Sequence, residues 1–115
     1  MTGTRSRVTT HVLDAVTGRP AAGLAVSLEQ ATEDGWQSVA NARTDDDGRI
    51  ADLSPVDLDP GTYRVSFDTA AYFLRTGQAS FYPEVVIAFR LDDAHAHYHV
   101  PLLLSPYAYS TYRGS

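Results

Sequence analysis

The sequence has no cysteine and no lysine among its 115 residues, and each absence excludes a kind of chemistry. Without cysteine, the chain cannot form a disulfide framework, use a thiolate nucleophile, or hold zinc or an iron–sulfur cluster through sulfur. Without lysine, it cannot form a Schiff base, and all nine of its cationic side chains are arginines. The lack of cysteine also fits a reducing compartment.

Long apolar segments are missing as well. No stretch approaches the roughly 20 apolar residues that a transmembrane helix needs, and the first residues lack the apolar core of a secretory signal. The net charge of −5 disfavours nucleic acid and anionic membranes as partners. We therefore expect a cytoplasmic protein that binds neither nucleic acid nor membrane.

The rest of the composition is ordinary for a globular protein, with 43% hydrophobic and 20% charged residues. A chain of this length has room for one modest core. We expect a flexible leader over residues 1–6 and a single domain over residues 7–115.

Alternation of apolar and polar residues predicts most of the secondary structure. Strands are expected over residues 8–14, 24–30, 36–43, from 49 onward, 63–67, 85–91, 97–104 and 109–113. Residues 68–77 break the alternation and predict a short helix, with Asp68 as its N-cap and Gly77 after its end. This helix must dock through residues such as Tyr72 or Phe73, because it is too short to be stable alone. Seven or eight short strands with one short helix indicate an all-β fold, a two-sheet antiparallel β-sandwich.

The segment from His95 to Ser115 is the most distinctive part of the chain. In an extended strand, every second residue from Tyr98 to Leu104 faces a core, whereas His97 and His99 point the other way. Histidines on an outer face either meet solvent or belong to a site. The aromatic and hydroxyl-rich residues that follow favour a site, because chain ends without a role are usually nondescript.

Two patterns could indicate a metal. His95, His97 and His99 stand at alternate positions, and three protein ligands are common at catalytic zinc. The other interpretation is a solvated polar face, since His95 lies in an acidic loop. A His-x-His pattern alone is a weak signal for a metal, so the solvated face is the better interpretation of the spacing.

The second pattern is the run Asp45–Asp47 before Gly48. An EF-hand loop with its glycine at Gly48 would begin at Arg43 and end at Ser54, and neither residue supplies the required carboxylate. A β-turn is the better interpretation. Its interest lies in Arg49, which the turn positions.

His11, Arg49 and His99 form a possible catalytic set across the chain. Two histidines can share general acid and base roles near neutral pH, and an arginine can stabilise developing negative charge on an oxygen. Spacing alone cannot show that these residues meet. No Gly-x-Ser-x-Gly pattern marks a serine nucleophile.

The motifs together resemble the transthyretin-related family over essentially the whole of residues 8–115. The motifs that carry the resemblance are Thr10–Asp14, Gly18-x-Pro20-Ala21, Asp47–Arg49, Gly61–Tyr63, the segment from Phe67-Asp68 to Tyr72-Phe73, His97–Leu103, and Ser105-Pro106 through Tyr112-Arg113-Gly114-Ser115. The last four residues are the most diagnostic. The resemblance points to the branch of the family that opens the 5-hydroxyisourate ring with water, giving 2-oxo-4-hydroxy-4-carboxy-5-ureidoimidazoline in urate breakdown.

This resemblance implies a transthyretin-like sandwich that assembles as a homotetramer, a dimer of dimers, with active sites at an interface between subunits. It implies that His11, Arg49 and His99 are catalytic. It also implies that His11, Arg49 and the segment Tyr112, Arg113, Gly114 and Ser115 bind the substrate, and that neither metal nor cofactor takes part.

Two other functions remain open beside this hydrolase. One is a small-molecule carrier with the same fold and no turnover. The hormone-carrying branch of the family lacks the set of His11, Arg49, His99 and the terminal four residues, so the intact set favours an enzyme. The other is a zinc-dependent hydrolase that uses His95, His97 and His99.

Overall fold

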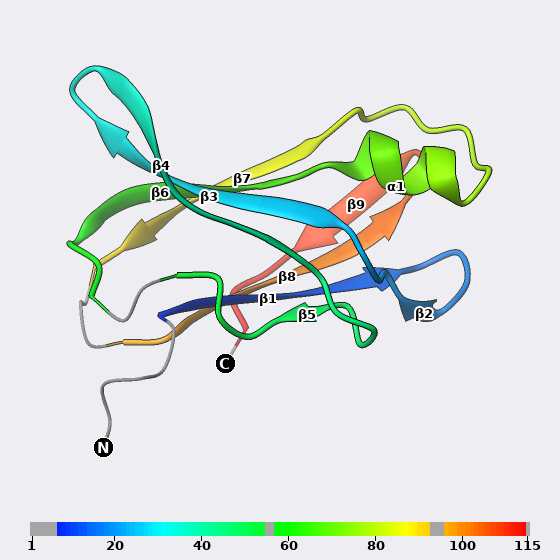
Figure 1. Ribbon diagram of the computed structural model, residues 1–115, viewed down its shortest axis with the longest axis horizontal. Helices are drawn as coiled ribbons and strands as arrows, with labels where there is room; N and C mark the ends of the chain where they lie inside the picture. Colours follow the sequence, from blue (N-terminus) through cyan, green and yellow to red (C-terminus); the bar gives the residue numbers. More distant parts are fainter. Residues whose placement is uncertain (1–6, 55–56, 93–95, 115) are drawn as a thin grey trace.

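The computed structural model describes residues 7–54, 57–92 and 96–114, and it shows two β-sheets packed face to face (Figure 1). The leader expected over residues 1–6 lies outside the described residues. In chain order the elements are β1 (Val8–Asp14), β2 (Arg19–Pro20), β3 (Ala25–Thr32), β4 (Gly35–Arg43), β5 (Arg49–Ile50), β6 (Gly61–Phe67), α1 (Thr69–Arg75), β7 (Val85–Leu91), β8 (Tyr98–Ser105) and β9 (Ala108–Thr111).

One sheet has the order β2-β1-β8-β9, with β5 also paired to β1, and the other has the order β4-β3-β6-β7. This arrangement confirms the predicted all-β sandwich with one short helix. The strand pairs are antiparallel except for β1 and β8, which run parallel. An alternating pattern has the same form in both directions, so it could not reveal this parallel pair.

The two-residue strands β2 and β5 both lie along the same edge of β1. β5 begins at Arg49, as expected, whereas β2 forms at Arg19–Pro20, where no strand was expected. β8 and β9 are each displaced by about one residue from their expected positions, which is the ordinary uncertainty of strand ends.

Period-two alternation builds the core between the sheets. Tyr63, Val65 and Phe67 of β6 are fully buried, and they pack opposite the buried side chains of β1 and β8. The prediction that every second residue from Tyr98 to Leu104 faces the core is also confirmed. The remaining faces of β1 and β8 point away from the core, and the candidate site lies there.

The helix docks as the sequence indicated. Asp68 caps its start by accepting a hydrogen bond from the Ala71 amide at 3.3 Å, and Gly77 follows its end with φ of 74°. Tyr72 and Phe73 are both buried.

A buried carboxylate ties the helix to the end of β1. Asp14 is 1% exposed, and its Oδ2 accepts a hydrogen bond from the Tyr72 hydroxyl at 2.8 Å. Its Oδ1 accepts from the amides of Val16 at 2.9 Å and Thr17 at 3.2 Å, which closes the turn after β1. These three hydrogen bonds offset the cost of burying a polar group.

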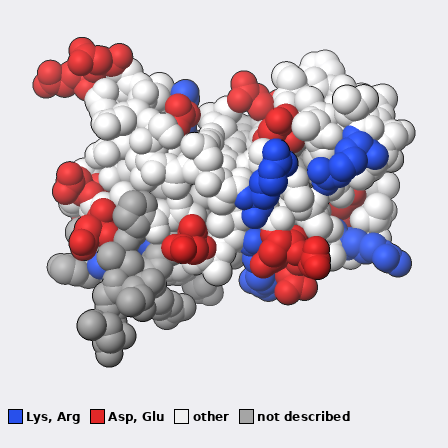
Figure 2. All heavy atoms as spheres, in the orientation of Figure 1, with Lys and Arg blue, Asp and Glu red and all other residues white. Residues whose placement is uncertain are grey.

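The surface mixes charges of both signs. On the described part of the face in Figure 2, arginine side chains are interspersed with aspartate and glutamate side chains. The hairpin of β3 and β4 projects beyond the sandwich and carries the exposed pair Glu33 and Asp34 at its tip. The only helix among the described residues has seven residues, and a helix that short cannot cross a bilayer.

The Asp14–Tyr72 bond gives a stability prediction. Burial, followed by the hydrogen bond to Asp14, raises the pKa of Tyr72 from 10.0 to about 12. Because the folded state holds this proton more tightly, the contribution is present below pH 10 and is lost as the pH rises toward about 12. Tyr72→Phe leaves the buried carboxylate without one donor and should lower the free energy of unfolding by about 1–3 kcal/mol at pH 7.

Urea unfolding at pH 7 and across the alkaline range tests this expectation. Tyr72→Phe should also flatten the alkaline decline in stability relative to the unsubstituted protein. Tyr107→Phe is the matched control, because Tyr107 is 66% exposed. Equal effects of the two substitutions would contradict a special role for the buried bond.

Candidate active site

The site begins with the outer face of β1. Thr9, His11 and Leu13 are partly buried and alternate with fully buried residues that face the core. The core side of the strand therefore fixes where these three outward side chains stand. His11 lies at the middle of the strand, where the backbone is paired on both sides.

β8 lies parallel to this strand and adds the second histidine. Thr9 is opposite His99, and His11 is opposite Pro101. Neighbouring strands lie about 4.8 Å apart, and residues in register point to the same face. His11 and His99 are therefore diagonal neighbours on one face of the sheet, as the sequence required for a shared site.

β5 brings Arg49 to the other side of His11. The two residues are directly paired in the antiparallel register of β1 and β5. His11 thus stands between Arg49 on one neighbouring strand and the His99 strand on the other.

The turn before β5 fixes the position of Arg49. The Asp45 carboxylate accepts hydrogen bonds from the amides of Asp47 at 2.9 Å and Arg49 at 3.0 Å. Gly48 has φ of 73° and its carbonyl accepts a hydrogen bond from the Val12 amide at 2.7 Å. A β-carbon at Gly48 would overlap the Val12 carbonyl oxygen, so only glycine lets the turn approach β1 this closely. The aspartate-rich run therefore acts as a structural turn.

The C-terminal segment closes over His99. The Gly114 amide donates a hydrogen bond to the His99 carbonyl at 2.8 Å, and the two residues form an isolated β-bridge. A β-carbon at Gly114 would overlap Cδ2 of the His99 ring. The absence of a side chain at Gly114 therefore lets the chain lie against the imidazole.

The other members of the expected terminal set lie in different surroundings. Tyr112 is 59% exposed. The Arg113 guanidinium lies 4.8 Å from the ring centre of Tyr98, a residue that faces the core side of β8. The structure therefore does not bring Arg113 onto the face that carries His11 and Arg49. Ser115 lies outside the described residues, and so does His95.

A hollow of about 330 Å³ adjoins His99. Tyr112 and Arg113 border it together with apolar residues of β7 and β8, namely Ile87, Phe89 and Val100. It opens between the edge of one sheet and the C-terminal segment of the other. The site thus has apolar surface beside its polar groups.

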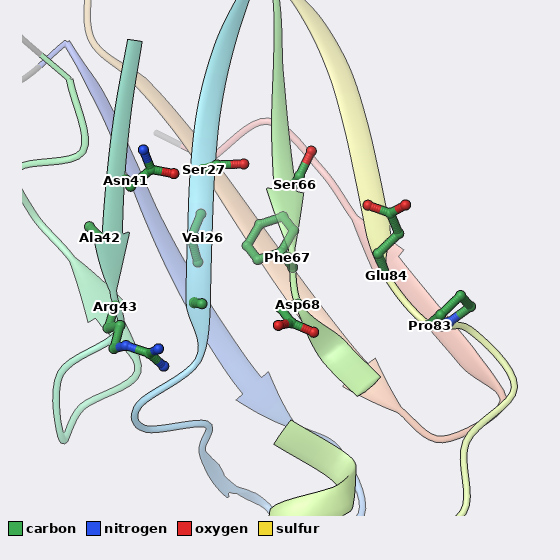
Figure 3. A pocket seen from close by; sticks show the side chains of 11 residues that line it. Val26, Ser27, Asn41, Ala42, Arg43, Ser66, Phe67, Asp68, Pro83 and Glu84 are labelled. Atoms are coloured by element: carbon green, nitrogen blue, oxygen red, sulfur yellow. The ribbon is translucent and has the colours of Figure 1, made fainter. Parts of the chain in front are cut away.

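A larger hollow of about 660 Å³ lies on the other sheet, away from the histidines (Figure 3). A row of small polar side chains crosses three strands there, with Asn41 opposite Ser27 and Ser27 opposite Ser66. Arg43 stands at one side and Glu84 at the other. None of the residues expected to act in catalysis borders this hollow.

The surroundings of His99 disfavour the charged form of its imidazole. Burial lowers its pKa below the ordinary 6.5, and the nearby charges of His97, His11 and Arg49 lower it further. A hydrogen bond to the main chain of Thr9 acts in the opposite direction. A neutral imidazole near pH 7 can accept a proton, which suits a general base.

No group of three histidine, cysteine, aspartate or glutamate side chains among the described residues is arranged to hold a metal ion. His97 and His99 instead meet the hydroxyl of Thr9. Thr9 Oγ1 lies 3.0 Å from Nε2 of His97 and 2.8 Å from Nδ1 of His99. Thr9 was not among the residues expected at the site, although its position two residues before His11 places it on the same face.

The sequence is similar to a known family and to named relatives. A family model described as HIUase/Transthyretin family matches residues 8–114. A 5-hydroxyisourate hydrolase from Salmonella dublin is 49% identical over 106 residues, which cover 91% of this chain and 78% of that protein.

Two solved structures show the same fold. The 5-hydroxyisourate hydrolase of Klebsiella pneumoniae superposes with a TM-score of 0.85 at 40% identity, covering 96% of this chain and all (100%) of that chain. The transthyretin of Sparus aurata superposes with a TM-score of 0.89 at 37% identity, covering 96% of this chain and 97% of that chain.

The electrostatics of the site predict how His99 titrates. We expect its pKa to lie below 6.5 and to rise when Arg49→Met removes a neighbouring positive charge. Ring-nitrogen NMR shifts of the labelled histidines, followed against pH, give this measurement. Arg43→Met, on the opposite sheet, should leave the His99 titration unchanged, and an equal response to both substitutions would show that Arg49 does not act locally.

Proposed function

The chain belongs to the HIUase/transthyretin family, as its motifs indicated, and we propose that it hydrolyses 5-hydroxyisourate to 2-oxo-4-hydroxy-4-carboxy-5-ureidoimidazoline in urate breakdown. The observation that carries this proposal is the placement of His11, Arg49 and His99 on one face by β1, β5 and β8. The reaction itself is proposed from the relatives that are named 5-hydroxyisourate hydrolases.

The reaction is the opening of a cyclic amide by water. Water adds to the ring carbonyl, the carbonyl oxygen gains negative charge, and the bond from that carbon to the ring nitrogen then breaks. The attacking oxygen must lose a proton, and the departing nitrogen must gain one. The chain has no cysteine and shows no serine motif for a covalent intermediate, so water is the nucleophile.

Each member of the set has a role that suits its surroundings. His99, with its lowered pKa, is neutral and takes the proton from water. Arg49 is permanently charged and presents a planar fork of donors, so it stabilises the developing oxyanion. His11 lies between them and supplies the proton to the departing nitrogen.

A carrier without turnover has the same overall fold, since the superpositions with a hydrolase and with a transthyretin are nearly equal. Fold alone therefore does not decide between enzyme and carrier. The side chains on the outer face of β1, β5 and β8 favour the hydrolase, because binding alone does not require two imidazoles beside a guanidinium.

We also propose a homotetramer, a dimer of dimers, in which a second subunit covers this outer face. The face carries apolar groups beside the polar set, including Leu13 and its register partner Leu103, which is 39% exposed. A partner would exclude water from them and enclose the substrate. Tyr112 and Gly114 would line the substrate pocket from the C-terminal segment, and we assign Arg113 and Ser115 to substrate binding by resemblance alone. The cytoplasmic location stays a prediction.

The decay of freshly made 5-hydroxyisourate, followed by its ultraviolet absorbance, tests the function directly. We expect the purified protein to accelerate this decay and to keep its activity after dialysis against EDTA. Arg49→Lys should lower the rate by about 10²–10³-fold, because lysine keeps the charge but loses the planar fork. Near-unchanged turnover would mean that Arg49 only completes the turn.

Light scattering on the same samples provides the control for assembly, with four chains expected for the protein and for Arg49→Lys. Full activity from a monomer would contradict a site enclosed between subunits. Loss of activity with chelator, and its return with zinc, would favour the zinc-dependent alternative.

The three histidines are expected to differ. His99→Asn and His11→Asn should each lower the rate by about 10²–10⁴-fold, the usual contribution of general acid–base catalysis. His97→Asn should lower it by no more than about 10-fold, because His97 reaches the reaction only through Thr9. Rates are compared on variants whose circular dichroism and size match the parent, and a dead His97→Asn beside an active His99→Asn would reverse the assignment.

A further inference from the structure

One hydroxyl bridges two histidines, His99 of β8 and His97 just before this strand. Thr9 Oγ1 lies within hydrogen-bonding distance of His97 Nε2, at 3.0 Å, and of His99 Nδ1, at 2.8 Å. A hydroxyl has one hydrogen to donate and lone pairs to accept with. It can therefore donate to one imidazole while it accepts from the other, and its direction can reverse.

We propose that Thr9 and His97 form a proton relay that connects His99 to the solvent. Within the proposed hydrolase, on which this inference rests, Thr9 is a positioning residue for the His99 ring and the middle member of the relay. His97 is its outer member. Neither residue touches the substrate.

The backbone holds the three groups in place. Thr9 and His99 are register partners on adjacent strands. His97 and His99 are two residues apart on an extended chain, so they point to the same face. His97 precedes the first residue of β8 and is exposed, whereas His99 is partly buried under Gly114. The relay therefore runs from the enclosed imidazole to the exposed one.

The transfer conserves protons and electron pairs. When His99 accepts a proton on Nε2, its ring carries hydrogens on both nitrogens. The Nδ1 proton then passes to Thr9 Oγ1, while the hydroxyl proton of Thr9 passes to Nε2 of His97. Thr9 regains its hydroxyl, His99 becomes neutral, and His97 becomes an imidazolium that releases a proton to water.

The charges around His99 favour transfer in this outward direction. His11 and Arg49 face it from β1 and β5, His97 faces it from its own chain segment, and all three disfavour a second positive charge there. Burial acts in the same sense. A proton on His99 is therefore held weakly and moves readily toward solvent.

Hydrogen exchange tests the relay without substrate. NMR measures how fast the ring N–H of His99 exchanges with water in protein carrying labelled histidine. Thr9→Val keeps the shape of the side chain but removes the hydroxyl, and His97→Asn removes the outer imidazole. Each should slow this exchange by about 10-fold, a rate change that corresponds to the typical free energy of one hydrogen bond. Thr9→Ser keeps the hydroxyl and should exchange at the parental rate.

Thr10→Val is the matched control on the neighbouring residue. The Thr10 hydroxyl is buried and donates to the Val100 carbonyl at 2.6 Å, on the opposite side of β1. Its loss should lower stability and leave His99 exchange unchanged. Unchanged or faster exchange in Thr9→Val would overturn the relay.

Turnover gives an independent measurement. His97→Asn should lower kcat by about 10-fold with little change in KM, and free imidazole in the buffer should restore it by accepting the proton in place of His97. A variant that imidazole cannot restore would overturn the relay. If the parental protein fails to hydrolyse 5-hydroxyisourate, the proposed function fails, and the exchange measurement still decides whether the relay exists.

Discussion

The parallel pairing of β1 and β8 is the contact on which the site depends. It joins residues about ninety positions apart, since Thr9 faces His99 across it. Its register decides which side chains meet: a shift by one residue would turn every outward side chain of one strand toward the core. The alternate burial of both strands excludes such a shift, because their apolar faces are buried in the same core. The hydrophobic core thus sets the positions of polar groups that it never touches.

β1 is held at two places by different means. At its end, the buried carboxylate of Asp14 joins the following turn to Tyr72 of the helix. At its middle, the Gly48 turn lies against Val12 and pairs Arg49 with His11. The site therefore draws on rigid strands and one tight turn, and such support suits the narrow tolerances required by the proton transfers proposed for these side chains.

Much of this could be predicted from the chain alone. The alternation around Val65 and Leu102 predicted which side chains face the core, and Asp68 with Gly77 marked the two ends of the helix. The direction of β1 relative to β8 could not be predicted, because alternation is the same in either direction.

The contacts of single side chains were also beyond the sequence. The two bonds of Thr9 and the stacking of Arg113 on Tyr98 depend on rotamers and on where the last strand crosses β8. His11, Arg49 and His99 were selected by chemistry and resemblance, and only the register of β1, β5 and β8 shows that they can meet.

The alternation of β1 has a consequence for how such a protein can evolve. Val8, Val12 and Asp14 are buried and stabilise the fold. Thr9 and His11, which alternate with them, point away from the core. Substitutions on the outer face can change what the protein does at small cost in stability, and the usual conflict between gaining an activity and keeping a fold is reduced. One scaffold can then diverge into enzymes and hormone carriers by exchanging every second residue of a few strands.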